Sequence, residues 1–223
     1  MEGNVGPETH ASDPGLLWRR ITDRIRQLGL TEEAVAQQAG MSTRYLRQLA
    51  AVGTDFDPQA LYRVAAALGT TTQELLEGRA DPPPGQAGGA PRPVLTRLTE
   101  AECWDRLGPQ GVGRVILPAE PAPVAFPVNY AVDAKTVVYR TALQGAAAPE
   151  GGTVVSFEVD RIDDRTHGGW SVLVAGAAER IEDAEEVRRL ARECIVEPWA
   201  GGDRPAWIRV RPDSVSGRRI GAL

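Results

Sequence analysis

Apolar residues recur every three or four positions through the first third of the chain, which is the spacing of one face of an α-helix. Leu17, Ile21 and Ile25 follow this spacing, and Gly29 ends the run. Four further segments each begin at or near a residue that favours a helix N-terminus, namely Thr31, Ser42, Asp57 and Thr72. The pattern therefore predicts five helices, over residues 16–28, 32–39, 43–49, 58–68 and 72–76.

From about residue 96 onward, the pattern changes to short runs rich in β-branched and other apolar residues. Helical spacing returns only over residues 99–107 and 183–194. Six short strands with few helices predict a barrel rather than a parallel sheet. The expected fold is α+β, a small all-α unit followed by a six-stranded β-barrel with flanking helices. The predicted strands cover residues 113–117, 124–132, 136–141, 153–160, 170–181 and 207–215.

A segment rich in proline, glycine and alanine separates the two patterns. The sequence RADPPPGQAGGAPRP, at residues 79–93, can neither pack as a helix nor extend a sheet. We therefore expect a disordered tail over residues 1–14, a helical domain over 15–78, a linker over 79–95 and a second domain over 96–223.

Composition narrows the class of protein. The chain has 223 residues, of which 42% are hydrophobic and 25% charged, so two small domains with their own cores are expected. No apolar run approaches the roughly 20 residues of a membrane helix, and the acidic opening segment lacks the apolar core of a secretory signal. The two cysteines, Cys103 and Cys194, fit no metal-binding spacing. We expect a cytoplasmic protein with no disulfide framework, no metal site and no membrane partner.

Two short helices joined by a glycine-containing turn, inside a five-helix unit, describe a helix-turn-helix. The sequence LGLTEEAVAQQAGMSTRYLRQL, followed by ALYRVAAALGTTTQELL, resembles the Cro/C1-type (phage-repressor-like) helix-turn-helix domain over residues 18–76. Ala36 matches the small residue that lets the two helices approach each other, and Gly40 matches the turn. The resemblance implies that double-stranded DNA is a partner.

The second helix of this motif would supply the DNA contacts. Arginine can bond guanine O6 and N7 together, glutamine can bond adenine N6 and N7, and a serine at the helix start can bond a phosphate. The same residues could instead be a solvated polar face. Glu32 and Glu33 depart from the family, which often has a glutamine early in the preceding helix, and two acids there would repel the DNA backbone. The candidate DNA-binding residues are Ser42, Thr43, Arg44, Arg47 and Gln48.

A second resemblance covers residues 98–220. In order, GRVIL, PVAFPVNYAVD, VVYRT, VVSFEVDRID, GWSVLVAGAAERI and PWAGGDRPAWIRVRPDSVSGRRI resemble the pyridoxamine 5′-phosphate oxidase-like, FMN-binding split-barrel superfamily. The resemblance implies a six-stranded split barrel that forms a homodimer with flavin at the subunit interface. FMN is the usual ligand in that family, and some branches bind the deazaflavin F420 or haem.

The same resemblance suggests which residues would hold the cofactor. Residues 127–130 would line the isoalloxazine ring with backbone groups, and residues 140 and 141 would lie on the phosphate side. Tryptophans in such positions serve equally well as core or dimer-interface residues. The candidate cofactor-binding residues are Pro127, Val128, Asn129, Tyr130, Arg140, Thr141, Trp170, Ser171 and Trp199.

The phosphate side also departs from the family. Many members follow the Arg-Thr pair with a polar stretch ending in lysine, whereas ALQGAAAPEGG here contains no basic residue. Lys135, the only lysine, precedes the strand that carries Arg140. Arg140 is therefore the main cation available to a phosphate there, unless it belongs to a solvated ion pair.

Three functions remain open at this stage. The preferred one is a DNA-binding transcriptional regulator whose barrel dimerises and binds FMN or a related flavin as a ligand or redox sensor. The second is an FMN- or F420-dependent oxidoreductase with an accessory helical domain. The third is a ligand-free barrel that serves only for dimerisation, which the missing lysine favours. No catalytic residue of the chain itself is identified, since no nucleophile elbow, P-loop or dinucleotide fingerprint is present.

Overall fold

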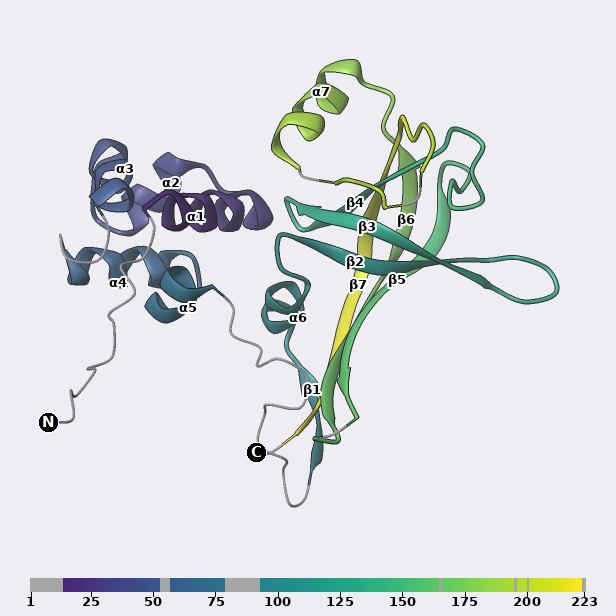
Figure 1. The fold of residues 1–223 in the computed structure, drawn as a ribbon, viewed down its shortest axis with the longest axis horizontal. Coiled ribbons are helices and arrows are strands. Elements are labelled where there is room, and N and C mark those ends of the chain that lie inside the picture. Colours follow the sequence, from purple (N-terminus) through teal and green to yellow (C-terminus); the bar gives the residue numbers. More distant parts are fainter. Residues whose placement is uncertain are drawn as a thin grey trace, which may run out of the picture. The chain divides into compact units, whose positions relative to one another are not determined.

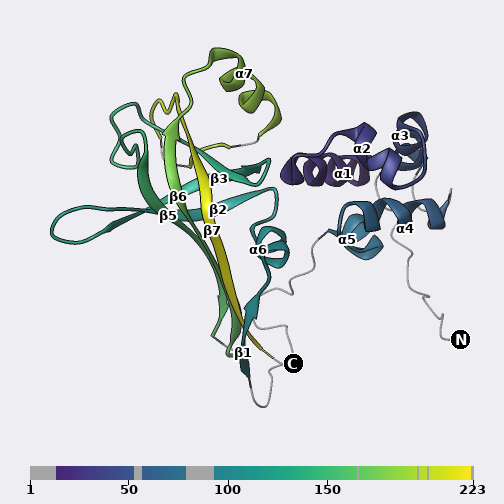
Figure 2. The same ribbon diagram turned by 180° about the vertical axis from the view of Figure 1, so that it is seen from behind.

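The computed structural model describes residues 14–52, 57–78, 93–164, 166–194, 196–199 and 201–221. It comprises a helical unit and a β-barrel unit (Figures 1 and 2). The α+β class predicted from the sequence is confirmed. Pro14, the last residue of the predicted tail, begins a helix, while the rest of the tail and most of the predicted linker lie outside the described residues.

The helical unit contains the five predicted helices. Their bounds are α1 Pro14–Leu28, α2 Glu32–Gln38, α3 Thr43–Val52, α4 Pro58–Ala67 and α5 Thr72–Glu77. Side-chain caps fix the N-termini of α2, α4 and α5, because the backbone N–H groups of a first turn have no partner within the helix. Thr31 accepts from the N–H of Ala34, Asp57 accepts from that of Ala60, and Thr71 forms a capping box with Glu74.

The turn between α2 and α3 has the backbone that its glycine requires. Gly40 has a φ of 66°, in the left-handed region that side chains disfavour. Ala36 is 2% exposed, as expected for the small residue at which the two helices meet. Behind them, the unit's core is made of Leu17, Ile21, Val35, Leu46, Leu49, Leu61, Val64 and Leu68.

The second unit is a closed antiparallel barrel with one added strand. Its strands are β1 Val94–Leu98, β2 Gln110–Leu117, β3 Val124–Asp133, β4 Thr136–Thr141, β5 Thr153–Asp163, β6 Gly168–Arg180 and β7 Ala206–Gly221. They follow the order β1-β7-β4-β3-β2-β5-β6, and pairing of β6 with β7 closes the ring of six. Figures 1 and 2 show the β2–β3 hairpin extending away from the barrel.

Strand β7 is longer than its sequence pattern predicts, and β1 is not predicted at all. The first five residues of β7 pair with β4, while its last five residues pair with β1. Val94 and Leu95, in the predicted linker, thus belong to a strand. The register shifts between Ala175 and Gly176, so that Asp213 of β7 has no partner on β6 and forms a β-bulge.

Apolar side chains fill the barrel, and two helices cover parts of it. The ring of Tyr130 meets that of Phe157 edge to face, with centroids 5.0 Å apart. Helix α6 (Glu100–Leu107) places Cys103, Trp104 and Leu107 in the same core. Helix α7 (Ala184–Glu193) covers the outside of β3, β4 and β7, where a second cluster contains Ala131, Val138, Leu190, Cys194, Val196 and Trp207.

A buried ion cluster fixes α7 to the sheet. Asp133, 4% exposed, accepts from both terminal nitrogens of Arg189, at 3.1 and 2.8 Å, and from Nη2 of Arg209 at 2.8 Å. Glu186 Oε1 lies 2.8 Å from Nη2 of each arginine. The hydrogen bonds from Arg189 and Arg209 lower the pKa of Glu186 to about 2, although burial opposes the shift.

No helix in the described part of the chain has the length and apolar character needed to cross a bilayer.

Candidate functional site

Helix α3 and the residue before it, Ser42, carry all five predicted DNA-contacting residues. Its inward side chains are Leu46, Leu49 and Ala50, all buried. Packing these residues against the rest of the unit turns the opposite face outward. Ser42, Arg44, Arg47 and Gln48 are exposed there, and Thr43 is half-buried.

The start of α3 is fixed by its cap and by a neighbouring contact. The hydroxyl oxygen of Ser42 accepts from the backbone N–H of Tyr45 at 3.2 Å, so Ser42 is an N-cap. The hydroxyl of Tyr45 donates to Asp57 Oδ2 at 2.9 Å, which ties α3 to the cap of α4. This bond raises the pKa of Tyr45, and the N–H of Ala60 together with the Tyr45 hydroxyl lowers the pKa of Asp57. The cap and the hydrogen bond thus hold α3, and with it the exposed face, in a fixed position.

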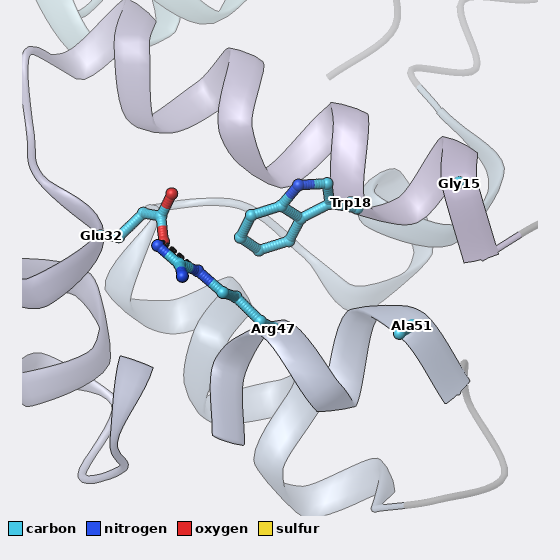
Figure 3. Close-up of a pocket in the computed structure, with 5 residues that line it drawn as sticks. All are labelled: Gly15, Trp18, Glu32, Arg47 and Ala51. Atoms are coloured by element: carbon cyan, nitrogen blue, oxygen red, sulfur yellow. Dashed lines mark hydrogen bonds and ion pairs between the residues drawn. The ribbon is translucent and has the colours of Figure 1, made fainter. Parts of the chain in front are cut away.

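Arg47 is held by an acid of the preceding helix. Its Nε donates to Glu32 Oε2 at 2.8 Å, and its Nη2 lies 2.8 Å from the same oxygen. The pair borders a shallow cavity of about 650 Å³ that is also lined by Gly15, Trp18 and Ala51 (Figure 3). The sequence predicts only that Glu32 repels DNA. The spacing of residues within one helix cannot show a contact between two helices, so the ion pair with Arg47 was not predicted.

The candidate cofactor residues divide between the two faces of the barrel wall. Val128, Tyr130, Thr141 and Trp170 are at most 9% exposed, and three of them belong to the barrel's core cluster. Tyr130 donates to the carbonyl of Leu107 at 2.5 Å. Trp170 lies in the core with the guanidinium of Arg106 5.9 Å from its ring centroid. These side chains do not face the outside of the barrel, so an outer ligand could meet only their backbone.

The other candidate residues lie on the outside of the barrel wall. Pro127 is exposed, while Asn129 and Arg140 are half-buried on neighbouring strands β3 and β4. The pairing of Tyr130 with Tyr139 puts Asn129 next to Arg140 across the ladder. Trp199 is 81% exposed, and its backbone N–H donates to Asn129 Oδ1 at 3.1 Å. The structure therefore brings Pro127, Asn129, Arg140 and Trp199 to one region. Ser171 lies apart from them on β6, which β2 and β5 separate from β3.

Arg140 is available to an anion. Its Nε donates to the carbonyl of Arg204 at 3.0 Å, and its guanidinium carbon lies 5.7 Å from the ring centroid of Trp207. Among the described residues, Arg140 has no ion pair with an acid. Its terminal nitrogens are therefore not committed to a carboxylate. Lys135 lies in the turn at the far end of β4, roughly 16 Å away along the strand, and does not supplement this charge.

A surface with several exposed apolar side chains lies beside Pro127 and Asn129. We call it the outer face; it comprises the outward side chains of β3, β2, β5 and β6. One row across it runs from Pro127 through Arg114 and Glu158 to Leu173. Arg114 is neutralised there, with Nη1 2.9 Å from Glu158 and 2.7 Å from Asp160. Large apolar side chains remain uncovered on it: Val112, Val154 and Leu173 are 39 to 64% exposed.

The described residues contain no group of three or more potential metal ligands. Burial raises the pKa of the Cys103 thiol, and raises that of Cys194 to about 11, so neither is activated as a nucleophile.

Comparison with known proteins gives matches for both units. A family model described as pyridoxamine 5′-phosphate oxidase matches residues 99–219, and one described as helix-turn-helix matches residues 22–75. The uncharacterized protein Rv0080 of Mycobacterium tuberculosis is 31% identical over 145 residues, which cover 61% of this chain and 94% of that protein.

Two solved structures are also similar. The FAD binding protein from Mycobacterium smegmatis is 31% identical, with 56% of this chain and 98% of that chain covered and a TM-score of 0.47. A conserved protein of unknown function from Corynebacterium diphtheriae is 30% identical, with 58% and 98% covered and a TM-score of 0.48.

Proposed function

The chain belongs to the pyridoxamine 5′-phosphate oxidase family and carries a helix-turn-helix domain ahead of the family barrel, and from this premise we propose that it is a DNA-binding transcriptional regulator. In this proposal the barrel dimerises and binds a flavin, which acts as a ligand or redox sensor. The observation that carries the proposal is the exposed polar face of α3 in a protein whose other unit belongs to a flavin-associated family.

DNA binding is supported by the chemistry of α3. Arg44, Arg47 and Gln48 stand at helical spacing on its exposed face and can reach base edges in a major groove. Ser42, at the start of the same helix, can bond a backbone phosphate. The buried side of α3 and the Tyr45–Asp57 bond hold this face rigid, which favours sequence reading over loose electrostatic attachment.

The polar groups on the outer side of β3 and β4 support a flavin site there. Arg140 offers terminal N–H groups to a phosphate, and the backbone of residues 127–130 and the side chain of Asn129 offer polar groups to a ring edge. Pro127 and Trp199 add apolar surface. A bound flavin would supply one- or two-electron redox chemistry, and the chain would supply only binding and orientation. FMN is the ligand proposed, with F420 as the alternative.

A homodimer is supported by the outer face next to this region. Exposed large apolar side chains on three adjacent strands, β2, β5 and β6, are typical of a protein interface. Pro127 belongs both to this face and to the flavin region, so a second copy would cover a flavin bound there. Two recognition helices related by a twofold axis would then read two half-sites.

The test is the visible absorption spectrum of the full-length protein after incubation with FMN, FAD or F420 and desalting. FAD is included because a relative is named for binding it. We expect one of them to be retained. Arg140→Ala should reduce retention at least tenfold, the scale of one lost charged hydrogen bond to a phosphate. Arg180→Ala, an exposed arginine at the end of β6, should not.

Each outcome separates the functions. Retained flavin together with DNA binding supports the sensor. Retained flavin with steady consumption of a reductant and no DNA binding supports the oxidoreductase. No retained absorbance with any of the three would contradict the flavin proposal and leave a dimerisation module. Equal retention by Arg140→Ala and the wild type would contradict the phosphate assignment alone.

A further inference from the structure

We infer that Glu32 is a positioning residue that fixes which edge of Arg47 meets the DNA, and that Arg47 thereby selects guanine at one position of each half-site. The inference rests on the proposed DNA-binding function and adds to it a base preference and the residue that enforces it.

The geometry of the pair decides which hydrogen-bond donors remain. A guanidinium is planar and carries five N–H groups, arranged along a side edge (Nε and Nη2) and an end edge (Nη1 and Nη2). Glu32 Oε2 lies 2.8 Å from both atoms of the side edge. The end edge keeps the two N–H groups of Nη1 and one of Nη2. Guanine is the base that offers two adjacent major-groove acceptors, O6 and N7, to such a parallel pair of donors.

The surroundings of the pair keep this arrangement. Glu32 and Arg47 are the only charged side chains among the described residues that line the cavity between α1, α2 and α3. Figure 3 shows the indole of Trp18 beside them, on the cavity side. An apolar wall on one side reduces screening of the pair by water. The Glu32 side chain is 27% exposed and that of Arg47 is 62% exposed, so the carboxylate is sheltered while the guanidinium reaches outward.

The two arginines of α3 are therefore not equivalent. Arg44 is exposed and has no ion pair among the described residues, so its side chain can follow the phosphates of any sequence. Arg47 has its side edge bound before DNA arrives, and loses less conformational freedom when it meets a base. A carboxylate near the DNA backbone repels the phosphates and lowers the affinity for DNA. This loss is offset when the same carboxylate positions an arginine that discriminates among bases.

The experiment is selection of duplexes from a randomised pool by the full-length protein, followed by titration of the enriched site and of its single-base variants. The variants are Glu32→Ala and Arg47→Ala, with Glu33→Ala as matched control. Glu33 stands in the same first turn and carries the same charge, but it is exposed and, among the described residues, Arg47 is paired with Glu32 and not with Glu33. An exposed ion pair contributes at most about 1 kcal/mol, so all three variants should fold.

We expect Arg47→Ala to abolish a guanine preference of roughly tenfold or more at one position per half-site. Glu32→Ala should reduce the preference at that same position by about threefold or more, and Glu33→Ala should leave it unchanged while raising affinity for all sequences slightly.

Three results overturn the inference. If the wild type enriches no sequence, the proposed function fails and the inference with it. If the wild type enriches a site but Arg47→Ala keeps every base preference, the protein does recognise a DNA sequence, but Arg47 does not select a base. If Glu32→Ala behaves like Glu33→Ala, with higher affinity and the same preference, Glu32 is only a repulsive charge.

Discussion

At the scale of single residues, Gly113 shows how closely the barrel is packed. A Cβ atom added there would overlap the ring of Phe157 and lie 2.9 Å from the carbonyl oxygen of Glu158. Neither neighbour can yield easily, because Phe157 is fully buried and Glu158 belongs to the paired strand. The absent side chain is what lets β2 and β5 approach each other.

We predict that Gly113→Ala destabilises the barrel by about 1–3 kcal/mol, the usual range for overpacking a core. Gly151→Ala is the control, because an added Cβ at Gly151 meets nothing within 4 Å. Thermal unfolding followed by the fluorescence of the buried tryptophans would measure the difference. Equal melting temperatures for the two variants would mean that β2 and β5 shift apart at little cost.

At the scale of elements, the attachment of α7 depends on charge as well as on apolar contact. Glu186 is half-buried beneath two arginines, which also share Asp133. The helix buries Leu190 and half-buries Val187, a small apolar contribution for ten residues. The ion cluster therefore supplies much of what holds this helix on β3, β4 and β7.

We predict that acid weakens this attachment. The pKa of Glu186 falls from 4.5 to about 2 on folding, so its stabilising effect is complete above pH 4.5 and is lost as the pH falls toward 2. The urea midpoint of the wild type should therefore drop more between pH 6 and pH 3 than that of Glu186→Gln. Glu185→Gln, which removes an exposed neighbour, should drop as the wild type does. Parallel curves for all three proteins would show that Glu186 does not couple folding to protonation.

The elements themselves were largely predictable, whereas their long-range contacts were not. Helical spacing and cap residues located α2 and α4 almost to the residue, because these signals act within a turn or two. Strand β1 was missed, since Val94 and Leu95 follow a proline-rich stretch and become a strand only by pairing with the end of β7. The Glu32–Arg47 pair was missed because it, too, joins residues from two separate elements. The opposite directions of Tyr130 and Asn129 follow from strand alternation, but the sequence does not say which of the two faces inward.

At the scale of the whole molecule, the outer face links the barrel to the proposed reading of DNA. Each α3 supplies few base contacts, so a single helical unit would bind weakly. Joining two units through the barrels makes the second contact intramolecular and can raise the apparent affinity by roughly 10²–10⁴. The dimer and the DNA affinity should therefore be lost together when the outer face is altered.

Leu173 allows this to be tested without unfolding the barrel. It is 39% exposed and pairs across the ladder with Glu158, so an arginine placed there finds a carboxylate within the same protomer. We predict that Leu173→Arg sediments as a monomer and binds the enriched duplex at least about 100-fold more weakly than the wild type. Leu143→Arg, at a more exposed leucine in the loop after β4, should remain dimeric and bind normally. A dimeric Leu173→Arg would place the interface elsewhere on the barrel. A monomeric variant with full affinity would mean that one recognition helix is sufficient, and that the barrel serves the DNA-binding unit through its ligand rather than through its symmetry.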